Sequence, residues 1–533
     1  MRFYLTSILF LLAGSGVALA AIDTPVKTDT GLVSGAPGKT TEVRVFKGIP
    51  FAAPPVGDLR WRAPQPAAKW EGVRSGDQFS ATCTTGAGGG GGRGQAKGGA
   101  PKGNPDQAKA KAAPVAARGP AGPPASEDCL YLNVWTPAKS ATDRLPVIVW
   151  TYGGGFTGGS GSEPRYDGEA LAQKGVVVVT YNYRLGVFGF LAHPDLTAES
   201  SHKASGNYGM MDMATALRWV QKNIAAFGGD PRRVTIDGES AGAFLVSVMV
   251  GSPEGKGLFL RAISQSGAWM GLGPAKMKTL AAAEAEGKKA AGTHTIAELR
   301  AMSAQEAAQN LRGVPSGVIV DGWMIPEDES ITYAKGKQND VDVLVGSNHD
   351  EGTFLVRGNT TAEQAKTRAE QTYGEFAPEF LKLYPAGSDA EATASRLADS
   401  RDELGWHMRT WAELQAKRGR KAYVYYFTHV PPGSGDRGAS HTFELAYMFN
   451  IPAANGSWTD TDKKLADMMS SYWVNFAATG DPNGKGLPAW QPYNAKTNDA
   501  KAMVFGDTPE FGPQIDAPRL AFFDKFYAVI KSR

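Results

Sequence analysis

The amino-acid sequence predicts an α/β fold in which a large, mostly parallel central sheet is flanked by helices. Short apolar runs rich in β-branched or aromatic residues, such as 146–152 and 176–181, predict buried strands. Between 210 and 227 the apolar residues recur at helical spacing, and 234–236 returns to the strand pattern. Strand, helix and strand in this order are typical of a parallel sheet.

The predicted sheet continues through most of the chain. The run 130–135 predicts a strand before these elements, and 341–345 and 422–427 predict two strands much later. The Ala-, Lys- and Glu-rich stretches 276–310 and 361–416 predict helical segments inserted between the strands. We find no internal repeat, so one sheet of this kind is the simplest organisation.

The N-terminus has the features of a secretory signal peptide. Arg2 precedes an apolar run at 3–12, and the small residues that follow end in an A-x-A site at 18–20. We expect cleavage after Ala20, leaving a secreted or periplasmic protein whose residues 21–533 form a single domain. An uncleaved membrane anchor is the alternative, but the apolar run is short, and no later segment predicts a membrane span.

A low-complexity segment, 84–126, lies between the only two cysteines, Cys83 and Cys129. It consists mainly of Gly, Ala, Pro, Lys and Gln, and its six Lys and Arg residues face only Asp106. Such a composition cannot form a packed core, so it predicts a long surface loop inserted within the domain. Because export leads to an oxidising compartment, we expect a Cys83–Cys129 disulfide; two separate buried thiols are the alternative.

The overall composition restricts the partners of the protein. A formal net charge of +3 over 533 residues gives no basic excess that would indicate a nucleic acid partner. Two cysteines are too few for a Cys-based structural zinc site. Composition alone leaves the function open.

The motif Gly-Glu-Ser-Ala-Gly at 238–242 predicts a catalytic nucleophile. It follows the predicted strand 234–236 and precedes a helical run at 244–250, which is the context of the nucleophile turn in the α/β-hydrolase fold. The sharp turn raises the hydroxyl of Ser240 above the sheet, and the flanking glycines relieve crowding. A G-x-S-x-G match can arise by chance among 65 glycines, but the strand before it and the helix after it favour catalysis.

A glycine run at 153–155 predicts donors for a developing oxyanion. It follows the predicted strand that ends at Tyr152, where a glycine turn can point successive N–H groups inward. We expect Gly154, Gly155 and the N–H of Ala241 to form the oxyanion hole. A plain turn is the alternative; a phosphate-binding loop is disfavoured by the glycine spacing and by the lack of a following lysine.

These motifs resemble those of the type B carboxylesterase and cholinesterase family. The likeness runs from about residue 31 to the C-terminal region and includes KGIPFA at 47–52, EDCLYLNVW at 127–135, NYRLG at 182–186 and GDPNG at 480–484. The resemblance implies an α/β-hydrolase fold and the hydrolysis of carboxylic esters.

The general base is expected after Ser240, because α/β-hydrolases carry the triad in the order Ser, acid, His. Five histidines follow the serine, at 294, 349, 407, 429 and 441. His441 lies in a loop opened by Gly and Ser beyond the strand 422–427, and the octet 438–445 resembles the histidine motif of the family. We therefore expect His441 to be the base, with His429 as the alternative.

The acid is expected in Asn-His-Asp-Glu-Gly at 348–352, which follows the strand 341–345. Physical chemistry alone does not separate Asp350 from Glu351, because either carboxylate could accept the imidazole N–H. The family motif N-x-D-E-G implies that Glu351 completes the triad. His349 is expected to be a loop residue or to support the site indirectly.

Two further residues are expected to tune the site. Glu239 adjoins the nucleophile, and Ser266 lies in Ser-Gln-Ser-Gly at 264–267, where the family places a supporting hydroxyl. Each could equally be a satisfied polar group without a catalytic role.

Taken together, the motifs predict acyl transfer through an acyl-enzyme, with a small-molecule ester as substrate and without a metal or cofactor. Two alternatives remain: a catalytically silent adhesion or binding protein of the same fold, which the intact Ser240, Glu351 and His441 set disfavours, and a lipase acting on lipid esters. Choline esters are disfavoured, because 84–128 lacks the aromatic residue that cholinesterases place within the first disulfide loop. The natural ester and the oligomeric state stay open.

Overall fold

A computed structural model describes most of the chain. The described residues are 22, 24–86, 123–271, 276–453, 456–496 and 501–532. The predicted signal peptide and residues 87–122 of the low-complexity segment lie outside the described residues. The expectations for export and for this segment therefore stay predictions.

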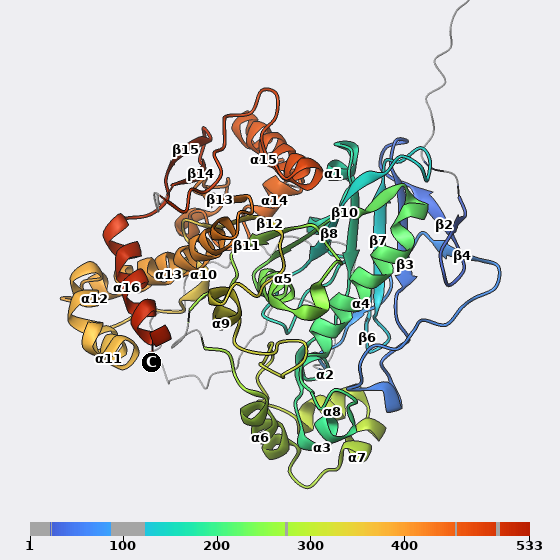
Figure 1. Cartoon of the computed structure of the whole chain (residues 1–533), viewed down its shortest axis with the longest axis horizontal. Helices are drawn as coiled ribbons and strands as arrows, with labels where there is room; N and C mark the ends of the chain where they lie inside the picture. Colours follow the sequence, from blue (N-terminus) through green and yellow to red (C-terminus); the bar gives the residue numbers. More distant parts are fainter. Residues whose placement is uncertain are drawn as a thin grey trace, which may run out of the picture.

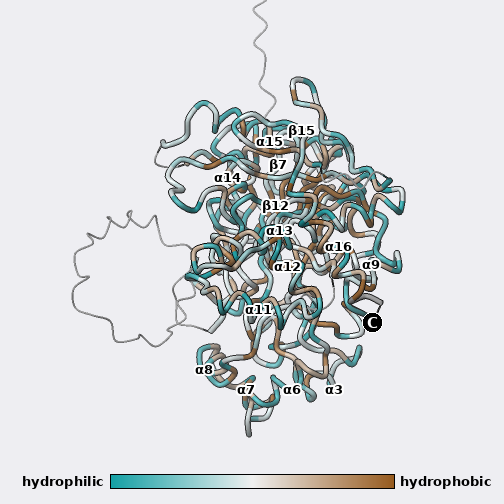
Figure 2. Tube along the Cα trace, turned by 90° about the vertical axis from the view of Figure 1, so that its left-hand side faces the viewer, coloured by the Kyte–Doolittle hydropathy of each residue, from teal (hydrophilic) through white to brown (hydrophobic). Residues whose placement is uncertain are grey.

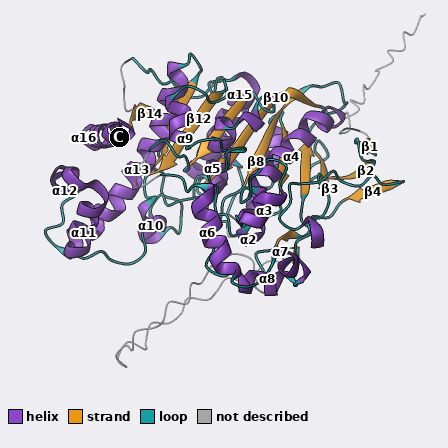
Figure 3. Ribbon diagram, turned by 60° about the horizontal axis from the view of Figure 1, so that its bottom comes forward, coloured by secondary structure: helices purple, strands orange, loops and turns teal. Residues whose placement is uncertain are grey.

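In the described part of the chain, thirteen strands form one large sheet (Figure 3). Their spatial order is β1-β2-β3-β7-β9-β8-β10-β11-β12-β13-β14-β15, with β4 beside β2. The strands are β1 (Val26–Lys27), β2 (Leu32–Pro37), β3 (Arg44–Pro50), β4 (Val73–Gly76), β7 (Tyr131–Thr136), β8 (Leu145–Thr151), β9 (Val177–Tyr181), β10 (Gly229–Glu239), β11 (Arg261–Gln265), β12 (Asp342–Asn348), β13 (Ala422–Phe427), β14 (Lys501–Phe505) and β15 (Glu510–Pro513).

The centre of the sheet is parallel, as the sequence predicts. Every neighbouring pair from β9 through β8, β10, β11, β12 and β13 to β14 is parallel, whereas β3–β7, β7–β9 and β14–β15 are antiparallel. Strands β9 and β13 are buried at every position. Continuous burial explains their unbroken apolar sequences, because helices cover both faces of a parallel sheet. The predicted α/β class and the mostly parallel sheet are confirmed.

The helices pack against the sheet in two groups (Figure 1). Helices α4, α5, α9 and α13 contact one another or the strands β10 to β13, and α1 and α15 pack on β8 and β9. The described helices are α1 (Glu169–Gln173), α2 (Gly186–Phe190), α3 (Pro194–Glu199), α4 (Tyr208–Asn223), α5 (Ala241–Gly251), α6 (Leu280–Ala291), α7 (Ile296–Ala301), α8 (Ala304–Asn310), α9 (Glu329–Ala334), α10 (Gly352–Leu355), α11 (Ala362–Tyr373), α12 (Ala377–Leu383), α13 (Asp389–Lys417), α14 (Leu445–Met448), α15 (Asp460–Thr479) and α16 (Ala517–Ser532).

The inserted segments are helical, and local capping residues divide them. The stretch 276–310 contains α6, α7 and α8. Thr295 caps α7 and Ser303 caps α8, through capping boxes with Glu298 and Glu306.

Hydrophobic segments gather around the central strands (Figure 2). No helix among the described residues is long and apolar enough to cross a membrane.

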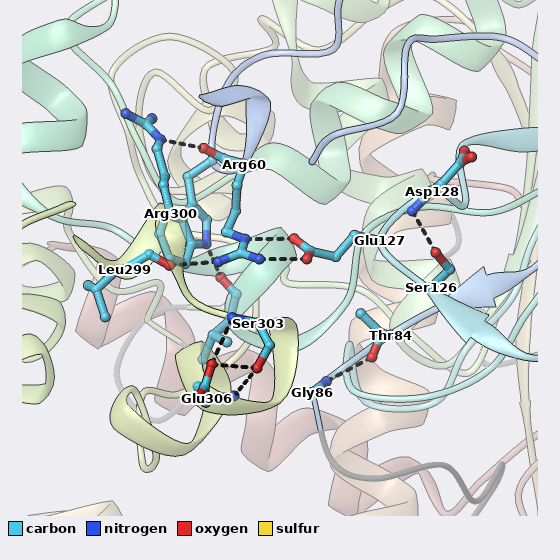
Figure 4. Close-up of polar contacts among 12 residues, drawn as sticks. Arg60, Thr84, Gly86, Ser126, Glu127, Asp128, Leu299, Arg300, Ser303 and Glu306 are labelled. Carbon is cyan, nitrogen blue, oxygen red and sulfur yellow. Dashed lines mark hydrogen bonds and ion pairs between the residues drawn. The ribbon is translucent and has the colours of Figure 1, made fainter. Parts of the chain in front are cut away.

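A disulfide and a buried ion pair hold the base of the low-complexity segment. Cys83 is bonded to Cys129, which confirms the predicted pairing. Figure 4 shows the guanidinium of Arg60 held by both carboxylate oxygens of Glu127, each at 2.7 Å, and by the carbonyl of Leu299 at 2.6 Å. The ion pair therefore ties the segment that contains Cys129 to helix α7.

Candidate active site

Ser240 lies at a strained turn between β10 and α5. Its φ of 55° falls in the left-handed region, which costs a residue with a side chain about 1–3 kcal/mol. The flanking glycines make this turn possible: a Cβ on Gly238 would lie 2.6 Å from the carbonyl oxygen of Gly242, and one on Gly242 would lie 2.0 Å from that of Thr151. The hydroxyl of Ser240 does not cap α5, so it is not held by the helix.

Glu351 and His441 meet through a short polar contact. Glu351 follows β12 and is fully buried, and its Oε2 lies 2.6 Å from Nδ1 of His441. The other oxygen, Oε1, accepts hydrogen bonds from Ser266 Oγ at 2.5 Å and from the backbone N–H of Asn348 at 2.9 Å. The carboxylate is thus fixed on both oxygens. It can accept a hydrogen bond from Nδ1–H of the neutral imidazole, and Nε2 is then the unprotonated ring nitrogen.

Glu239 occupies the other side of the imidazole. Its Oε1 lies 3.0 Å from Nε2 of His441. Neither atom has a hydrogen-bond partner among the described residues, so the contact is an ion pair without hydrogen-bond alignment. Burial alone lowers the pKa of His441, but the charges of Glu239 and Glu351 outweigh it and raise the pKa well above its usual value.

The glycine run after β8 lies directly against the nucleophile. A Cβ on Gly153 would fall 2.8 Å from Cβ of Ser240, and Gly154 and Gly155 adopt φ values of 111° and 61°. No acceptor among the described residues binds the N–H of Gly154 or Gly155. The N–H of Ala241 belongs to the first turn of α5, where the helix provides no acceptor. The glycine run therefore begins against Ser240 and presents backbone donors without a protein acceptor.

Phe354 covers one face of the imidazole. Its ring stacks on His441 with centroids 4.7 Å apart and planes 25° apart, and its side chain is 55% exposed. Phe354 belongs to α10, which begins directly after Glu351. The buried histidine is therefore covered on this face by an aromatic ring that is itself exposed.

The sequence matches the model of a known protein family. The model of the carboxylesterase family matches residues 22–523. The chain belongs to the carboxylesterase family. The resemblance seen in the sequence is confirmed, and this carboxylesterase is a carboxylic ester hydrolase.

Named relatives of this carboxylesterase match over nearly their whole length. It is 39% identical to fumonisin B1 esterase of Sphingopyxis macrogoltabida, over 93% of this chain and 90% of the relative. It is 32% identical to liver carboxylesterase 1F of Rattus norvegicus, over 95% and 94%.

Solved structures of other esterases share the fold of this carboxylesterase. A PNB esterase superposes with a TM-score of 0.77 at 29% identity, covering 93% of this chain and 98% of the other. The carboxylesterase EST55 of Geobacillus stearothermophilus superposes with a TM-score of 0.76 at 30% identity, covering 93% and 99%. The predicted α/β-hydrolase fold is confirmed.

The side chains of the alternative base and the alternative acid have other partners. His429 contacts Asp507 through Nδ1 at 2.6 Å and Asp462 through Nε2 at 2.9 Å. Asp350 accepts the backbone N–H of Ala439 at 2.7 Å and contacts the neighbouring His349. In the described part of the chain, no hydrogen bond or ion pair joins the side chain of Asp350 to the imidazole of His441, or the imidazole of His429 to the carboxylate of Glu351.

Sequence reasoning missed one carboxyl group of the site. Glu444 is fully buried, and its Oε2 accepts a hydrogen bond of 2.5 Å from the amide of Asn348. Burial, together with the charges of Glu239 and Glu351, raises the pKa of Glu444 to about 8. The octet at 438–445 contains this residue, and its place three residues after His441 was the available signal. Its neutral form adds no further negative charge to the cluster at pH 7.

Across the described residues, no group of His, Cys, Asp and Glu side chains is arranged to hold a metal ion.

Proposed function

We propose that this carboxylesterase cleaves its substrates through a Ser240–His441–Glu351 triad and a covalent acyl-enzyme. The observation that carries the proposal is the 2.6 Å contact between Nδ1 of His441 and Oε2 of Glu351, next to the strained turn of Ser240. A carboxylate on Nδ1 fixes the tautomer in which Nε2 can accept a proton.

In the proposed reaction, Ser240 Oγ attacks the ester carbonyl carbon while its proton passes to His441 Nε2. The N–H groups of Gly154, Gly155 and Ala241 stabilise the negative oxygen of the tetrahedral intermediate. The carbon–oxygen bond to the alcohol then breaks, and the alcohol takes the proton from His441. Water adds to the acyl-enzyme with His441 again as base, which releases the acid and restores the serine hydroxyl.

Glu239 has a defined part in this scheme. In the resting arrangement Nε2 of His441 faces Glu239 at 3.0 Å. We propose that the imidazole turns Nε2 to Ser240 Oγ when an ester binds, while Glu351 keeps hold of Nδ1. Glu239 would then stabilise the imidazolium that forms during the attack.

The deciding experiment compares the wild type with Ser240→Ala on a short-chain p-nitrophenyl ester, and follows a phosphonate adduct by intact mass. We expect hydrolysis and labelling in the wild type and the loss of both in Ser240→Ala, because no other group supplies the nucleophile. Circular dichroism of the two proteins checks that the variant keeps its fold. A folded wild type that neither hydrolyses the ester nor takes the label would contradict the proposal.

The relative named fumonisin B1 esterase makes fumonisin B1 the first natural ester to assay. We propose it as a candidate substrate, because the identity of 39% extends over 93% of this chain. Release of acid from fumonisin B1 by the wild type but not by Ser240→Ala supports this choice. No release, with activity on p-nitrophenyl esters retained, would remove fumonisin B1 and keep the triad.

A further inference from the structure

A carboxyl group that the proposed mechanism does not use lies buried just before the nucleophile. Asp237 stands on β10 ahead of Ser240, and its side chain is fully buried. Residues two positions apart on a strand point to the same face, so Asp237 and Glu239 share one face of the sheet. Oδ1 of Asp237 accepts a hydrogen bond of 3.0 Å from the amide of Gln265, and Oδ2 has no hydrogen-bond partner among the described residues. A buried carboxylate with so few hydrogen bonds is poorly stabilised in its charged form.

Asp237 is one of four buried carboxyl groups near the proposed triad. We call them the carboxyl cluster: Asp237, Glu239, Glu351 and Glu444, each at most 1% exposed. Burial raises the pKa of Tyr425 well above its usual value, and the charges of all four groups raise it further, so all four lie near this phenol. The Tyr425 ring passes over Gly346, where a Cβ would lie 2.4 Å from it, and packs on Trp473 of α15 with centroids 5.4 Å apart.

The carboxyl cluster has few cations with which to pair. In the part of the chain that the structure describes, its ion pairs all involve one imidazole, His441, which contacts Glu239 at 3.0 Å and Glu351 at 2.6 Å. The charge of Arg165 also acts on Glu239, but the Arg165 side chain is 47% exposed and pairs with Glu163 at 2.7 Å. Four carboxylates around one imidazolium would leave most of the buried negative charge unpaired, which is strongly unfavourable.

The contacts of each carboxyl group indicate which members of the cluster stay charged. Two members contact a ring nitrogen of His441, whereas the other two, Asp237 and Glu444, are bonded to neutral side-chain amides. Burial raises the pKa of Asp237 well above its usual value, and burial with two neighbouring carboxylates raises that of Glu444 to about 8. Helix α15 adds no buried cation, since its one buried charged residue is Asp462. A protonated carboxyl group needs no cation.

We propose that Asp237 is a neutral carboxylic acid in the folded enzyme and a positioning residue that holds the amide of Gln265 away from Glu239. Gln265 stands directly opposite Glu239 on the neighbouring strand β11, but its amide donates to Asp237 instead. Glu239 therefore keeps its charge for Nε2 of His441. The effect on His441 rests on the triad proposed above, whereas the protonation of Asp237 does not depend on it.

The first experiment compares the unfolding of the wild type and of Asp237→Asn in denaturant between about pH 5 and pH 7, where an aspartate of the unfolded chain is ionised. A neutral Asp237 must release its proton on unfolding, so the wild type loses stability relative to the variant as the pH rises. We expect the ratio of unfolding constants, wild type over variant, to rise about tenfold per pH unit. A ratio that does not change with pH would show an ionised Asp237 and overturn the proposal.

Thr235→Val is the matched control for unfolding. Thr235 lies on the same strand and face as Asp237, is fully buried, and has a hydroxyl without a hydrogen-bond partner among the described residues. Valine removes this polar atom and changes no titratable group. The ratio of unfolding constants for this variant should therefore be the same at every pH.

Infrared spectroscopy tests the charge of Asp237 in the folded protein. The difference spectrum between the wild type and Asp237→Asn at neutral pH should contain the carbonyl band of a protonated carboxylic acid. A difference spectrum with the bands of a carboxylate instead would refute the neutral state. This measurement requires no activity.

The acid limb of kcat/KM tests the positioning role. Asp237→Asn keeps an acceptor for Gln265 and removes no charge, so the limb should stay within about 0.2 unit of the wild type. Asp237→Val frees the amide to donate to Glu239, which weakens the hold of Glu239 on the proton of His441, so the limb should move to lower pH by about half a unit. Asp237→Ala serves if Asp237→Val does not fold.

The outcomes separate this proposal from the triad. A shifted limb in Asp237→Asn, or an unshifted limb in Asp237→Val, would overturn the positioning role while phosphonate labelling of Ser240 persists. A folded wild type that is inactive and unlabelled would refute the triad, and unfolding and infrared spectra would still decide the charge of Asp237.

Discussion

Each ring nitrogen of His441 contacts a carboxylate, Glu351 at Nδ1 and Glu239 at Nε2, and these contacts affect the pH dependence of the site. Burial lowers the pKa of the imidazole, and Glu239 and Glu351 together raise it well above its usual value. In the proposed mechanism, only the neutral imidazole of His441 can accept the proton of Ser240. The active form therefore accumulates as the pH rises through this raised pKa, and it is lost as the pH falls.

Removing the charge of Glu239 is expected to shift this profile. In Glu239→Gln one of the two carboxylates that hold the proton on His441 is gone, so the pKa of His441 falls and the acid limb of kcat/KM moves to lower pH. An opposite charge at this distance is worth about one unit or more. The profile of p-nitrophenyl acetate hydrolysis between about pH 5 and pH 9 measures the shift. An acid limb that stays in place would refute this role for Glu239.

Glu444→Gln is the control for that experiment. The pKa of Glu444 is raised to about 8, so its carboxyl group is mainly neutral below that pH. A neutral glutamine should therefore move the acid limb of kcat/KM less than Glu239→Gln does, because Glu444 bonds to Asn348 whereas Glu239 lies 3.0 Å from Nε2 of His441.

The sequence predicted which segments come together in the site, but it did not predict which side-chain atoms of those segments make contact. Ser240, Glu351 and His441 follow the ends of β10, β12 and β13, and parallel strands bring such ends to one edge of a sheet. The choice between Asp350 and Glu351 depended on which carboxyl group the turn points inward, and a sequence does not encode that direction locally. The approach of Glu239 to Nε2 depends in the same way on side-chain rotamers.

At the scale of elements, strands with apolar sequences were predictable and a strand with polar residues was not. Strand β11 is buried at every position although it contains Arg261, Ser264 and Gln265. Ser264 donates to the carbonyl of Gly267, and Gln265 donates to Asp237. These partners come from the turn after the strand and from β10. The buried polar groups of β11 are therefore satisfied only when the sheet has assembled, and the local sequence does not reveal this.

The ion pair between Arg60 and Glu127 connects separate elements, and its loss should lower the free energy of unfolding. In Arg60→Ala the carboxylate of Glu127, whose side chain is 12% exposed, loses both of its bonds to the guanidinium. Breaking one partner of a buried pair costs about 3–5 kcal/mol. Denaturant unfolding of the wild type and the variant measures this loss.

An exposed pair provides the comparison for Arg60. Lys525 and Glu379 form an ion pair whose side chains are 56% and 43% exposed. Lys525→Ala should lower the free energy of unfolding by no more than about 1 kcal/mol, because water already screens such pairs. Equal losses in Arg60→Ala and Lys525→Ala would contradict the idea that burial makes the Arg60 contact valuable.

At the scale of the whole molecule, the alternation of strands and helices predicted the parallel centre of the sheet but not its edges. Strands β3, β7 and β15 pair antiparallel with their neighbours. A short strand pairs in the direction that its connection and its neighbours allow, and these are properties of the assembled chain. Hydrophobic periodicity reports burial and carries no information on strand direction.

The Cys83–Cys129 disulfide should contribute to the stability of the whole domain. It joins residues separated by 46 positions, and a closed loop of this length lowers the entropy of the unfolded chain. The double variant Cys83→Ser/Cys129→Ser should lose about 4 kcal/mol of unfolding free energy. Denaturant unfolding in the absence of reductant checks this value, and a loss below about 1 kcal/mol would show that strain in the native state offsets the entropy.

The order of the strands along the chain is also an order in time. A ribosome makes β10 and the Ser240 turn first, then β12 with Glu351, and only later β13 and the loop of His441. The nucleophile therefore exists for the length of about two hundred residues of synthesis before its base does. Under the proposed triad, a nascent or truncated chain that ends before His441 carries the serine without its general base, so ester hydrolysis would require the nearly complete polypeptide.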